Sequence, residues 1–288
     1  MPGVIIGVNC GTYTVNYQGV NYQASARGVF RNLGIKPVVG DLVDFDDNNF
    51  VITKVYERQN YLKRPLIANI DQLLIVESVL EPEFSYLLAF KYLTYANMHN
   101  LKAKIILTKI DKLKDLALID EIKKVFLKFE VEVYPLSNID HAGVNEVKSL
   151  FANHITALIG QTGVGKSSLI NSLDENYERA IGEYSKALGR GKHQTKEVIL
   201  LPYENGYIAD TPGFSSLDLE LYKEDLAEFY PGFAKFYGKC FFNDCLHINE
   251  KNCLIKEMVA SGQYPKVAYD CYLKLSNQAI NKFKRFEK

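Results

Sequence analysis

One eight-residue segment, Gly160-Gln-Thr-Gly-Val-Gly165-Lys166-Ser167, constrains the fold of this chain more than any other part of the sequence. An apolar run at residues 156–159 precedes it and a helical pattern follows, so the segment joins a predicted strand to a predicted helix. Gly160 and Gly165 allow the backbone to curl so that its N–H groups point at phosphate oxygens, and the helix start adds its positive end. The pattern predicts an α/β domain that binds the phosphates of a nucleotide.

A second segment, Asp210-Thr-Pro-Gly213, follows another predicted strand and is typical of a magnesium-binding and phosphate-sensing loop. Lys166 would bridge the β and γ phosphates, Ser167 would ligate Mg²⁺, Asp210 would hold the magnesium shell and the Gly213 N–H would sense the γ phosphate. The predicted phosphate-side residues are Gly160, Gln161, Thr162, Gly163, Val164, Gly165, Lys166, Ser167, Ser168, Asp210 and Gly213.

The base is predicted from Thr108-Lys109-Ile110-Asp111, which ends a buried apolar strand at residues 104–107. A carboxylate accepts two hydrogen bonds from guanine N1–H and N2–H₂, whereas adenine offers no such pair of donors, so GTP is favoured over ATP. Ser137 and Asn138 follow the next strand, where a backbone N–H could contact guanine O6. The predicted base-side residues are Thr108, Lys109, Asp111, Ser137 and Asn138.

These two nucleotide motifs occur in the reverse of the usual order, because residues 108–111 precede residues 160–167. The nucleotide domain is therefore predicted to be a circularly permuted GTPase domain. In this order the chain that leaves residues 210–213 runs directly into a C-terminal segment, so nucleotide state is coupled to whatever that segment contacts.

The chain is predicted to contain several domains: an N-terminal OB-type β-barrel at residues 1–66, the central α/β P-loop GTPase domain at 67–217 and a C-terminal, mostly helical zinc-binding domain at 218–288. Short alternating runs predict the barrel strands, with residues 61–65 as a linker. A strand face with Arg27, Arg31, Lys54 and Arg58 beside Tyr13, Tyr22 and Phe30 would bind RNA; alternatively, these aromatic residues form the barrel core. The predicted barrel strands are residues 4–8, 13–17, 21–26, 42–45 and 51–56.

Apolar runs that alternate with long helical patterns predict a parallel sheet covered by helices in the central domain. Its predicted strands are residues 73–79, 104–107, 131–136, 156–159, 198–201 and 207–209, and its predicted helices are residues 84–99, 116–128 and 144–152.

Three cysteines and one histidine lie within fourteen residues of the C-terminal segment, at Cys240, Cys245, His247 and Cys253. Three thiolates and one imidazole fill a closed tetrahedral site, which predicts one structural zinc ion. Cys10 and Cys271 lie outside the cluster and are predicted to be small buried residues. Helices are predicted at residues 223–229 and 265–288. The last cations could contact RNA or form a charged, frayed terminus; they are Lys282, Lys284, Arg285 and Lys288.

The formal net charge of zero divides unevenly along the 288 residues. Residues 1–66 hold seven Lys or Arg against five Asp or Glu, residues 67–230 hold seventeen against twenty-four, and residues 231–288 hold ten against five. Basic ends around an acidic middle suit a catalytic core whose flanking modules bind a polyanion, although a solvated charged face gives the same pattern. The sequence has no apolar run long enough to cross a membrane and no basic secretory start, so a cytoplasmic protein that does not bind membranes is expected.

The motif series, together with Gly40-Asp41-Leu-Val-Asp-Phe45, Leu188-Gly-Arg-Gly-Lys-His193-Gln-Thr195 and Cys240-x4-Cys245-x-His247-x5-Cys253, closely resembles the RsgA family, also called YjeQ or YloQ, over nearly the whole chain. The resemblance implies a GTPase that binds the immature small ribosomal subunit and its rRNA late in assembly. Such a factor releases maturation factors and departs after hydrolysing GTP to GDP. We expect the chain to act as a monomer.

Hydrolysis requires a group that positions the attacking water, a task often given to a glutamine just after the Asp-x-x-Gly motif. Here that place holds Phe214, which cannot hydrogen-bond water. His193, in a predicted switch loop, is the nearest candidate, and the resemblance assigns this role to a histidine at that position. It also implies that Thr195 completes the magnesium shell, although Gln194 departs from the usual His-Thr-Thr. The predicted catalytic residues are therefore Lys166, His193 and Thr195.

Because Phe214 lacks the usual chemistry, the sequence also permits an RNA-binding module that senses guanine nucleotide and hydrolyses it only incidentally. A permuted GTPase that serves the large ribosomal subunit is disfavoured by the N-terminal barrel and the cysteine cluster. Stimulation of turnover by small subunits, by large subunits or by neither distinguishes the three hypotheses.

Overall fold

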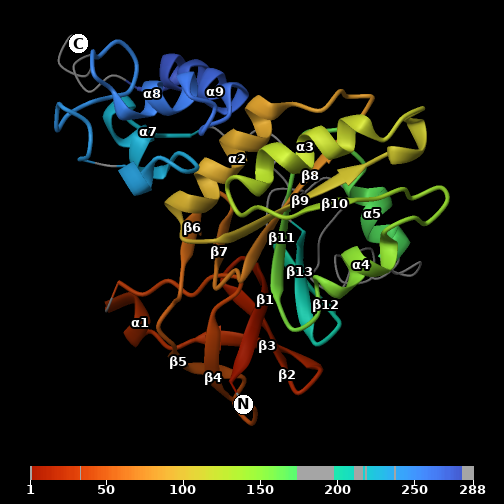
Figure 1. Cartoon of the computed structure of the whole chain (residues 1–288). Coiled ribbons are helices and arrows are strands. Elements are labelled where there is room, and N and C mark those ends of the chain that lie inside the picture. The colour runs from red at the N-terminus through yellow and green to blue at the C-terminus, as the bar shows by residue number, and fades with distance from the viewer. Residues whose placement is uncertain are drawn as a thin grey trace. The chain divides into compact units, whose positions relative to one another are not determined.

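The computed structural model describes residues 2–32, 34–173, 198–210, 217, 219–236 and 238–280 (Figure 1). The chain divides into two compact units. The first unit contains Met1–Leu74, Gly143–Thr162 and Lys166–Ser216. The second unit contains Ile75–Ala142, Gly163–Gly165 and Leu217–Lys288. The domain boundaries predicted near residues 66 and 217 stay predictions.

The first unit begins with a closed barrel in the strand order β1-β2-β3-β5-β4, drawn in red in Figure 1. Neighbouring strands are antiparallel except for β3 and β5, which are parallel. The prediction of a five-stranded OB-type barrel is confirmed. The elements are β1 (Gly3–Asn9), β2 (Thr12–Tyr17), β3 (Val20–Ala26), α1 (Val29–Asn32), β4 (Leu42–Asp46) and β5 (Val51–Val55).

The barrel core corrects part of the predicted RNA-binding face. Tyr13 on β2 and Phe30 on α1 are buried among Val15, Val43 and other apolar side chains of the barrel core. For these two residues the alternative, a core role, is right. The Tyr22 ring remains half-buried at the surface.

The Gly40-Asp41 pair of the barrel has a structural role. Gly40 has a φ of +89°, and a Cβ atom there would lie 2.0 Å from the carbonyl oxygen of Ala68, so only glycine fits. The carboxylate of Asp41 is fully buried and pairs with Arg58, whose Nε lies 2.7 Å from Asp41 Oδ1. Arg58 therefore holds the barrel together and does not belong to an open cationic face.

Residues 61–65, predicted to be a linker, begin a small antiparallel hairpin of β6 (Tyr61–Lys63) and β7 (Leu66–Ala68). Leu62 and Ile67 of this hairpin are fully buried. The basic, proline-containing sequence concealed the two apolar positions that fix the hairpin.

The remaining strands have the order β10-β9-β8-β11-β13-β12, and the division between the units falls within β8 (Gln72–Ser78). In the first unit, β11 (Ile155–Ile159) is parallel to β13 (Gly206–Asp210). Strand β12 (Ile199–Tyr203) is antiparallel to β13, which corrects the prediction of an all-parallel sheet. Glu204 and Asn205 both have positive φ angles and make a tight turn, which is too short for a parallel crossover.

In the second unit, β9 (Lys102–Thr108) is parallel to β10 (Val133–Pro135). The helices that follow β8 and β9 in this unit are α2 (Tyr86–Met98) and α3 (Ala117–Leu127). The Ser85 side chain caps α2 by accepting a hydrogen bond from the Leu88 N–H. The first unit carries α4 (Val144–Ser149) and α5 (Lys166–Leu173).

The C-terminal part of the second unit contains α7 (Lys223–Phe229), α8 (Leu254–Ala260) and α9 (Lys266–Gln278). The prediction of α7 is confirmed, α8 was missed, and the helix predicted to residue 288 ends at Gln278, after which Ile280 pairs with Tyr222. Helices α7 and α9 pack against α2 (Figure 1). Four terminal cations were predicted either to contact RNA or to form a charged, frayed end, and they lie outside the described residues: Lys282, Lys284, Arg285 and Lys288.

A chain of buried aromatic rings runs from the helices of this unit to the cysteine cluster. The ring centroids of Phe126 and Phe90 are 5.2 Å apart, and those of Phe90 and Tyr230 are 5.7 Å apart. Phe233 then lies 5.1 Å from Tyr230 and 5.1 Å from the imidazole of His247. The cluster therefore shares one hydrophobic core with α2 and α3.

The two remaining cysteines differ from each other. Cys271 on α9 is buried, as predicted, whereas Cys10 is exposed, because it lies with a φ of +47° in the turn between β1 and β2. Among the described residues, none of the helices combines the length and apolar character needed to span a bilayer.

Candidate nucleotide and metal sites

Residues 108–112, called the base turn below, leave the buried end of β9. Thr108 is fully buried, Lys109 has a φ of +61°, and Asp111 lies in a single 3₁₀ turn, Ile110–Lys112. The Ser137 hydroxyl, from the loop after β10, donates a hydrogen bond to Asp111 Oδ1 at 3.0 Å. The carboxylate predicted to bind guanine is therefore oriented by a side chain from the loop that follows the neighbouring strand β10.

Ser137 and Asn138 thus have different roles. The Ser137 N–H donates to the Ala142 carbonyl, which leaves Asn138 as the backbone donor of the predicted pair. Asn138 Nδ2 also lies 3.9 Å from where a Cβ of Gly165 would be. Its Oδ1 is buried and has no hydrogen-bond partner among the described residues. An unsatisfied buried oxygen beside the phosphate loop suits a polar ligand.

The base turn contacts the phosphate loop within the second unit. The Thr108 hydroxyl donates to the Val164 carbonyl at 2.5 Å, and Lys109 Nζ donates to the Gly163 carbonyl at 2.7 Å. Val164 is fully buried. The contact between Thr108 and Val164 joins residues 56 positions apart, as expected if both motifs belong to one nucleotide site.

The phosphate loop joins β11 to α5, which begins at Lys166. Gly163 and Gly165 have φ angles of +87° and +95°, so the loop requires glycine at both positions. In the first unit, Lys166 Nζ donates to the carbonyl oxygens of Gly160 at 2.5 Å and Gln161 at 2.9 Å. The amine therefore lies over the loop, where it can meet phosphate oxygens. The exposed hydroxyl-bearing positions of this segment are Thr162, Ser167 and Ser168.

Several predicted site residues are not placed. His193, Thr195 and Gly213 lie outside the described residues. The backbone of Asp210 ends β13 opposite Ile199, as predicted for a residue at a strand end.

One loop near the base turn was not singled out from the sequence. Lys109 Nζ also donates to the carbonyl oxygen of Glu81, and Lys112 pairs with the Glu81 carboxylate. Glu81 lies in the loop between β8 and α2, with a φ of +54°. The sequence did hold one signal for this loop. It directly follows a predicted buried strand, and the ends of such strands are where ligands bind in open α/β sheets.

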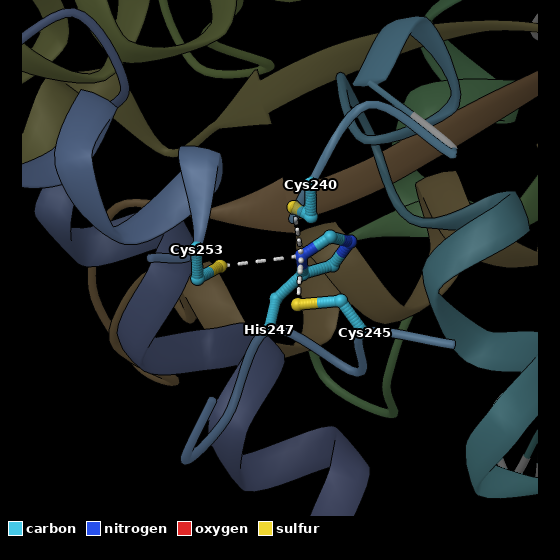
Figure 2. A group of neighbouring side chains, drawn as sticks. All are labelled: Cys240, Cys245, His247 and Cys253. Carbon is cyan, nitrogen blue, oxygen red and sulfur yellow. Dashed lines mark hydrogen bonds between the residues drawn. The ribbon is translucent and has the colours of Figure 1, made fainter. Parts of the chain in front are cut away.

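The four predicted zinc ligands converge in the second unit (Figure 2). His247 Nδ1 lies 3.5 Å from the sulfur of Cys240 and 3.4 Å from those of Cys245 and Cys253. A tetrahedral zinc ion, with Zn–S near 2.3 Å and Zn–N near 2.0–2.1 Å, requires about 3.6 Å between nitrogen and sulfur. The arrangement therefore fits a closed zinc site.

Burial shifts the pKa values of Cys245 and His247 toward the neutral forms of both side chains. Burial raises the pKa of the Cys245 thiol to about 12, because a thiolate is poorly solvated there. Burial lowers the pKa of His247, so its imidazole is favoured in the neutral form that binds metal. A divalent cation would stabilise the thiolates that burial opposes.

The loop around His247 is held by neighbouring polar groups. The hydroxyls of Tyr269 and Tyr272 donate to the carbonyl oxygens of His247 at 2.8 Å and Leu246 at 2.6 Å. Burial opposes ionisation of Glu250, but N–H groups including those of Leu246 and Ile248 hold the pKa of its carboxyl below the ordinary value. These contacts hold the loop around His247 in place, as polar neighbours do for the ligands of a metal site.

Known proteins match the chain over nearly its whole length. The RsgA GTPase model matches residues 55–220, and the RsgA N-terminal domain model matches residues 2–50. The small ribosomal subunit biogenesis GTPase RsgA of Halalkalibacterium halodurans is 36% identical, with 99% of each chain covered. Its counterpart in Streptococcus agalactiae is 38% identical, covering 100% of this chain and 98% of the relative.

Two crystal structures resemble the fold. YjeQ from Thermotoga maritima matches with a TM-score of 0.82 and 29% identity, covering 96% of this chain and 97% of that one. YloQ, described as a circularly permuted GTPase, matches with a TM-score of 0.80 and 29% identity, covering 100% and 97%. The permuted order predicted from residues 108–111 and 160–167 is therefore confirmed. The chain belongs to the RsgA GTPase family, and it is a GTPase.

Proposed function

We propose that this GTPase acts in late maturation of the small ribosomal subunit, where it binds rRNA and leaves after GTP hydrolysis. The observation that carries the proposal is the similarity, over the full chain, to relatives named small ribosomal subunit biogenesis GTPases. It acts in the cytoplasm as a monomer. A sensor with incidental hydrolysis is not favoured, because the matching relatives are named as GTPases.

The roles proposed for the nucleotide-binding residues follow from their chemistry. Asp111 accepts hydrogen bonds from guanine, and the Asn138 N–H donates to guanine O6. Lys166 and the loop N–H groups bind the phosphates. Mg²⁺ accompanies GTP and is held by Ser167 and Thr195.

We propose one structural zinc ion at Cys240, Cys245, His247 and Cys253. All four ligands come from protein, so the ion has no open position for catalysis and supports the fold of the C-terminal segment. This segment and the barrel contact rRNA, and Thr195 and Gly213 sense the γ phosphate, so that GTP favours binding to the small subunit and its hydrolysis favours release.

Turnover of GTP is expected to rise at least about tenfold when purified small ribosomal subunits are added, because the subunit would position His193 for hydrolysis. The measurement is phosphate release at saturating GTP with small subunits, with large subunits or with neither. Equal rates in all three would contradict the proposed function. Stimulation by large subunits alone would show that the protein acts on the large ribosomal subunit instead.

Replacement of His193 by alanine is expected to lower subunit-stimulated kcat by about 10²-fold, the range for loss of a group that acts on the attacking water. The dissociation constants for GTP and GDP should change less than about twofold, since Asp111 and Lys166 remain. Gln194→Ala is the matched control in the same loop. Stimulated turnover equal to that of the control would remove His193 from the mechanism.

A further inference from the structure

The loop between β8 and α2 contacts both ends of the base turn. At one end, Lys109 Nζ donates to the Glu81 carbonyl and, at 2.7 Å, to the Gly163 carbonyl of the phosphate loop. At the other end, Lys112 Nζ donates to the Glu81 carboxylate. Asp111 lies between these two lysines in the single 3₁₀ turn. One residue, Glu81, therefore restrains the turn on both sides of the guanine-binding carboxylate.

Glu81 is itself well anchored through the loop that carries it. The Val79 N–H donates to the Thr108 carbonyl at 3.1 Å, and the Ser78 hydroxyl donates to the Pro82 carbonyl at 2.7 Å. Pro82 lies near Gly163, at 3.8 Å from where a Cβ of that glycine would be. The loop is thus fixed before and after Glu81, next to both nucleotide motifs.

The Glu81 side chain has no packing role that would explain this position. It is 74% exposed, and its carboxylate contacts Lys112, which is 36% exposed. The hydrogen bond and charge of Lys112 lower the pKa of the Glu81 carboxyl, so it is ionised at neutral pH. Its contact therefore acts on the base turn rather than on the core.

We propose that Glu81 is a positioning residue for guanine recognition: by holding Lys112 and Lys109 it keeps Asp111 in the orientation that accepts the N1–H and N2–H₂ donors of guanine. This inference rests on the proposed role of Asp111. It predicts an effect on nucleotide binding and not on the chemical step, because the Glu81 carboxylate contacts Lys112 of the base turn, whereas Lys109 contacts the phosphate loop and Glu81 through backbone carbonyl oxygens that a side-chain substitution keeps.

Glu81→Gln is expected to weaken binding of GDP and GTP equally, by about two- to fivefold at low salt, which is the range for an exposed ion pair. The loss should shrink as ionic strength rises, since salt screens the pair. The value of kcat should stay constant while KM for GTP rises, and the thermal unfolding midpoint should not move. A fluorescent GDP analogue in competition with GDP, GTP and ADP measures these affinities on the full chain.

Glu83→Gln is the matched control, because this substitution removes the same charge from the same loop, and Glu83 is exposed without an ion pair in the described part of the chain. Lys112→Gln should weaken binding as much as Glu81→Gln, and the double variant should be no weaker than either single variant.

Two outcomes would overturn the inference: affinity of Glu81→Gln equal to that of Glu83→Gln at low salt, or additive losses in the Glu81→Gln, Lys112→Gln double variant. The proposed function fails differently. If Asp111→Asn leaves guanine binding unchanged, Asp111 does not bind the base. If Asp111→Asn weakens binding strongly while Glu81→Gln has no effect, only the positioning role of Glu81 is excluded.

Discussion

Replacement of Asp111 by asparagine is expected to weaken GDP and GTP binding by about 30- to 1,000-fold, and to create affinity for xanthine nucleotides. In its proposed role the Asp111 carboxylate would accept two charge-assisted hydrogen bonds from guanine, which together would contribute about 2–4 kcal/mol. The asparagine amide keeps one acceptor but turns an N–H₂ donor toward the N2–H₂ of guanine. Xanthine carries an oxygen at that position, so the same amide matches it.

Competition of GDP and xanthosine diphosphate against a fluorescent nucleotide measures this change of preference. Asp120→Asn is the control, because Asp120 is an exposed carboxylate on α3 in the same unit. The Asp111→Asn variant should retain the Ser137 contact, since an amide oxygen still accepts from that hydroxyl. A preference for GDP as strong as in the control would show that Asp111 does not bind the base.

Much of the fold was predictable from the sequence because its patterns are local. Alternating runs located the barrel strands, and the glycine spacing of the phosphate loop located both the turn and the start of α5 at Lys166. The base turn was predicted because its tetrapeptide follows an apolar run that ends at a strand terminus. The cysteine spacing likewise predicted a four-residue cluster, and the potential ligand atoms of these side chains lie within 4.8 Å of one another.

The parts that escaped prediction depend on contacts between distant residues. Alternation alone does not say which face of a small barrel is inside, so the sequence left two roles open for Tyr13, a binding face or the core, and the structure shows that it belongs to the core. Phe30 lies on α1, and its place in the same core depends on how that helix packs on the barrel. Arg58 resembled a surface cation until its partner Asp41, seventeen residues earlier, was placed beside it. Glu81 contacts Lys112 across 31 positions, and a single acidic residue in a loop carries no signal of that pairing.

The C-terminal segment presents the largest expected effect on stability. Its four predicted metal ligands lie beside a hydrophobic core that continues from His247 through Phe233 and Tyr230 to Phe90 of α2. The Asn97 side chain of α2 also donates to the Phe229 carbonyl at 2.8 Å. Each aromatic pair contributes about 0.5–1.5 kcal/mol beyond the area it buries. Loosening the loop around His247 is therefore expected to weaken the packing of α2.

Cys253→Ser is therefore expected to abolish stoichiometric zinc and to destabilise the second unit by at least about 3 kcal/mol, since bound metal contributes directly to folding. For a chain of this size, that loss lowers the unfolding midpoint by about 6–12 °C. Metal content measured by mass spectrometry and thermal unfolding followed by circular dichroism test the two parts. Cys10→Ser, which replaces an exposed cysteine outside the cluster, controls for thiol chemistry.

The contacts of α2 with the C-terminal segment predict that zinc affects nucleotide binding as well as stability. Removal of zinc from the unaltered protein by a chelator should lower its unfolding midpoint. If the chain of aromatic contacts transmits the loss of zinc through α2, release of GDP should also become faster, because Phe126 and Phe90 belong to the same unit as the base turn. Re-addition of zinc should restore both. A zinc-free protein with an unchanged midpoint would contradict a structural metal, whereas a lowered midpoint with unchanged GDP release would confine its influence to the C-terminal segment.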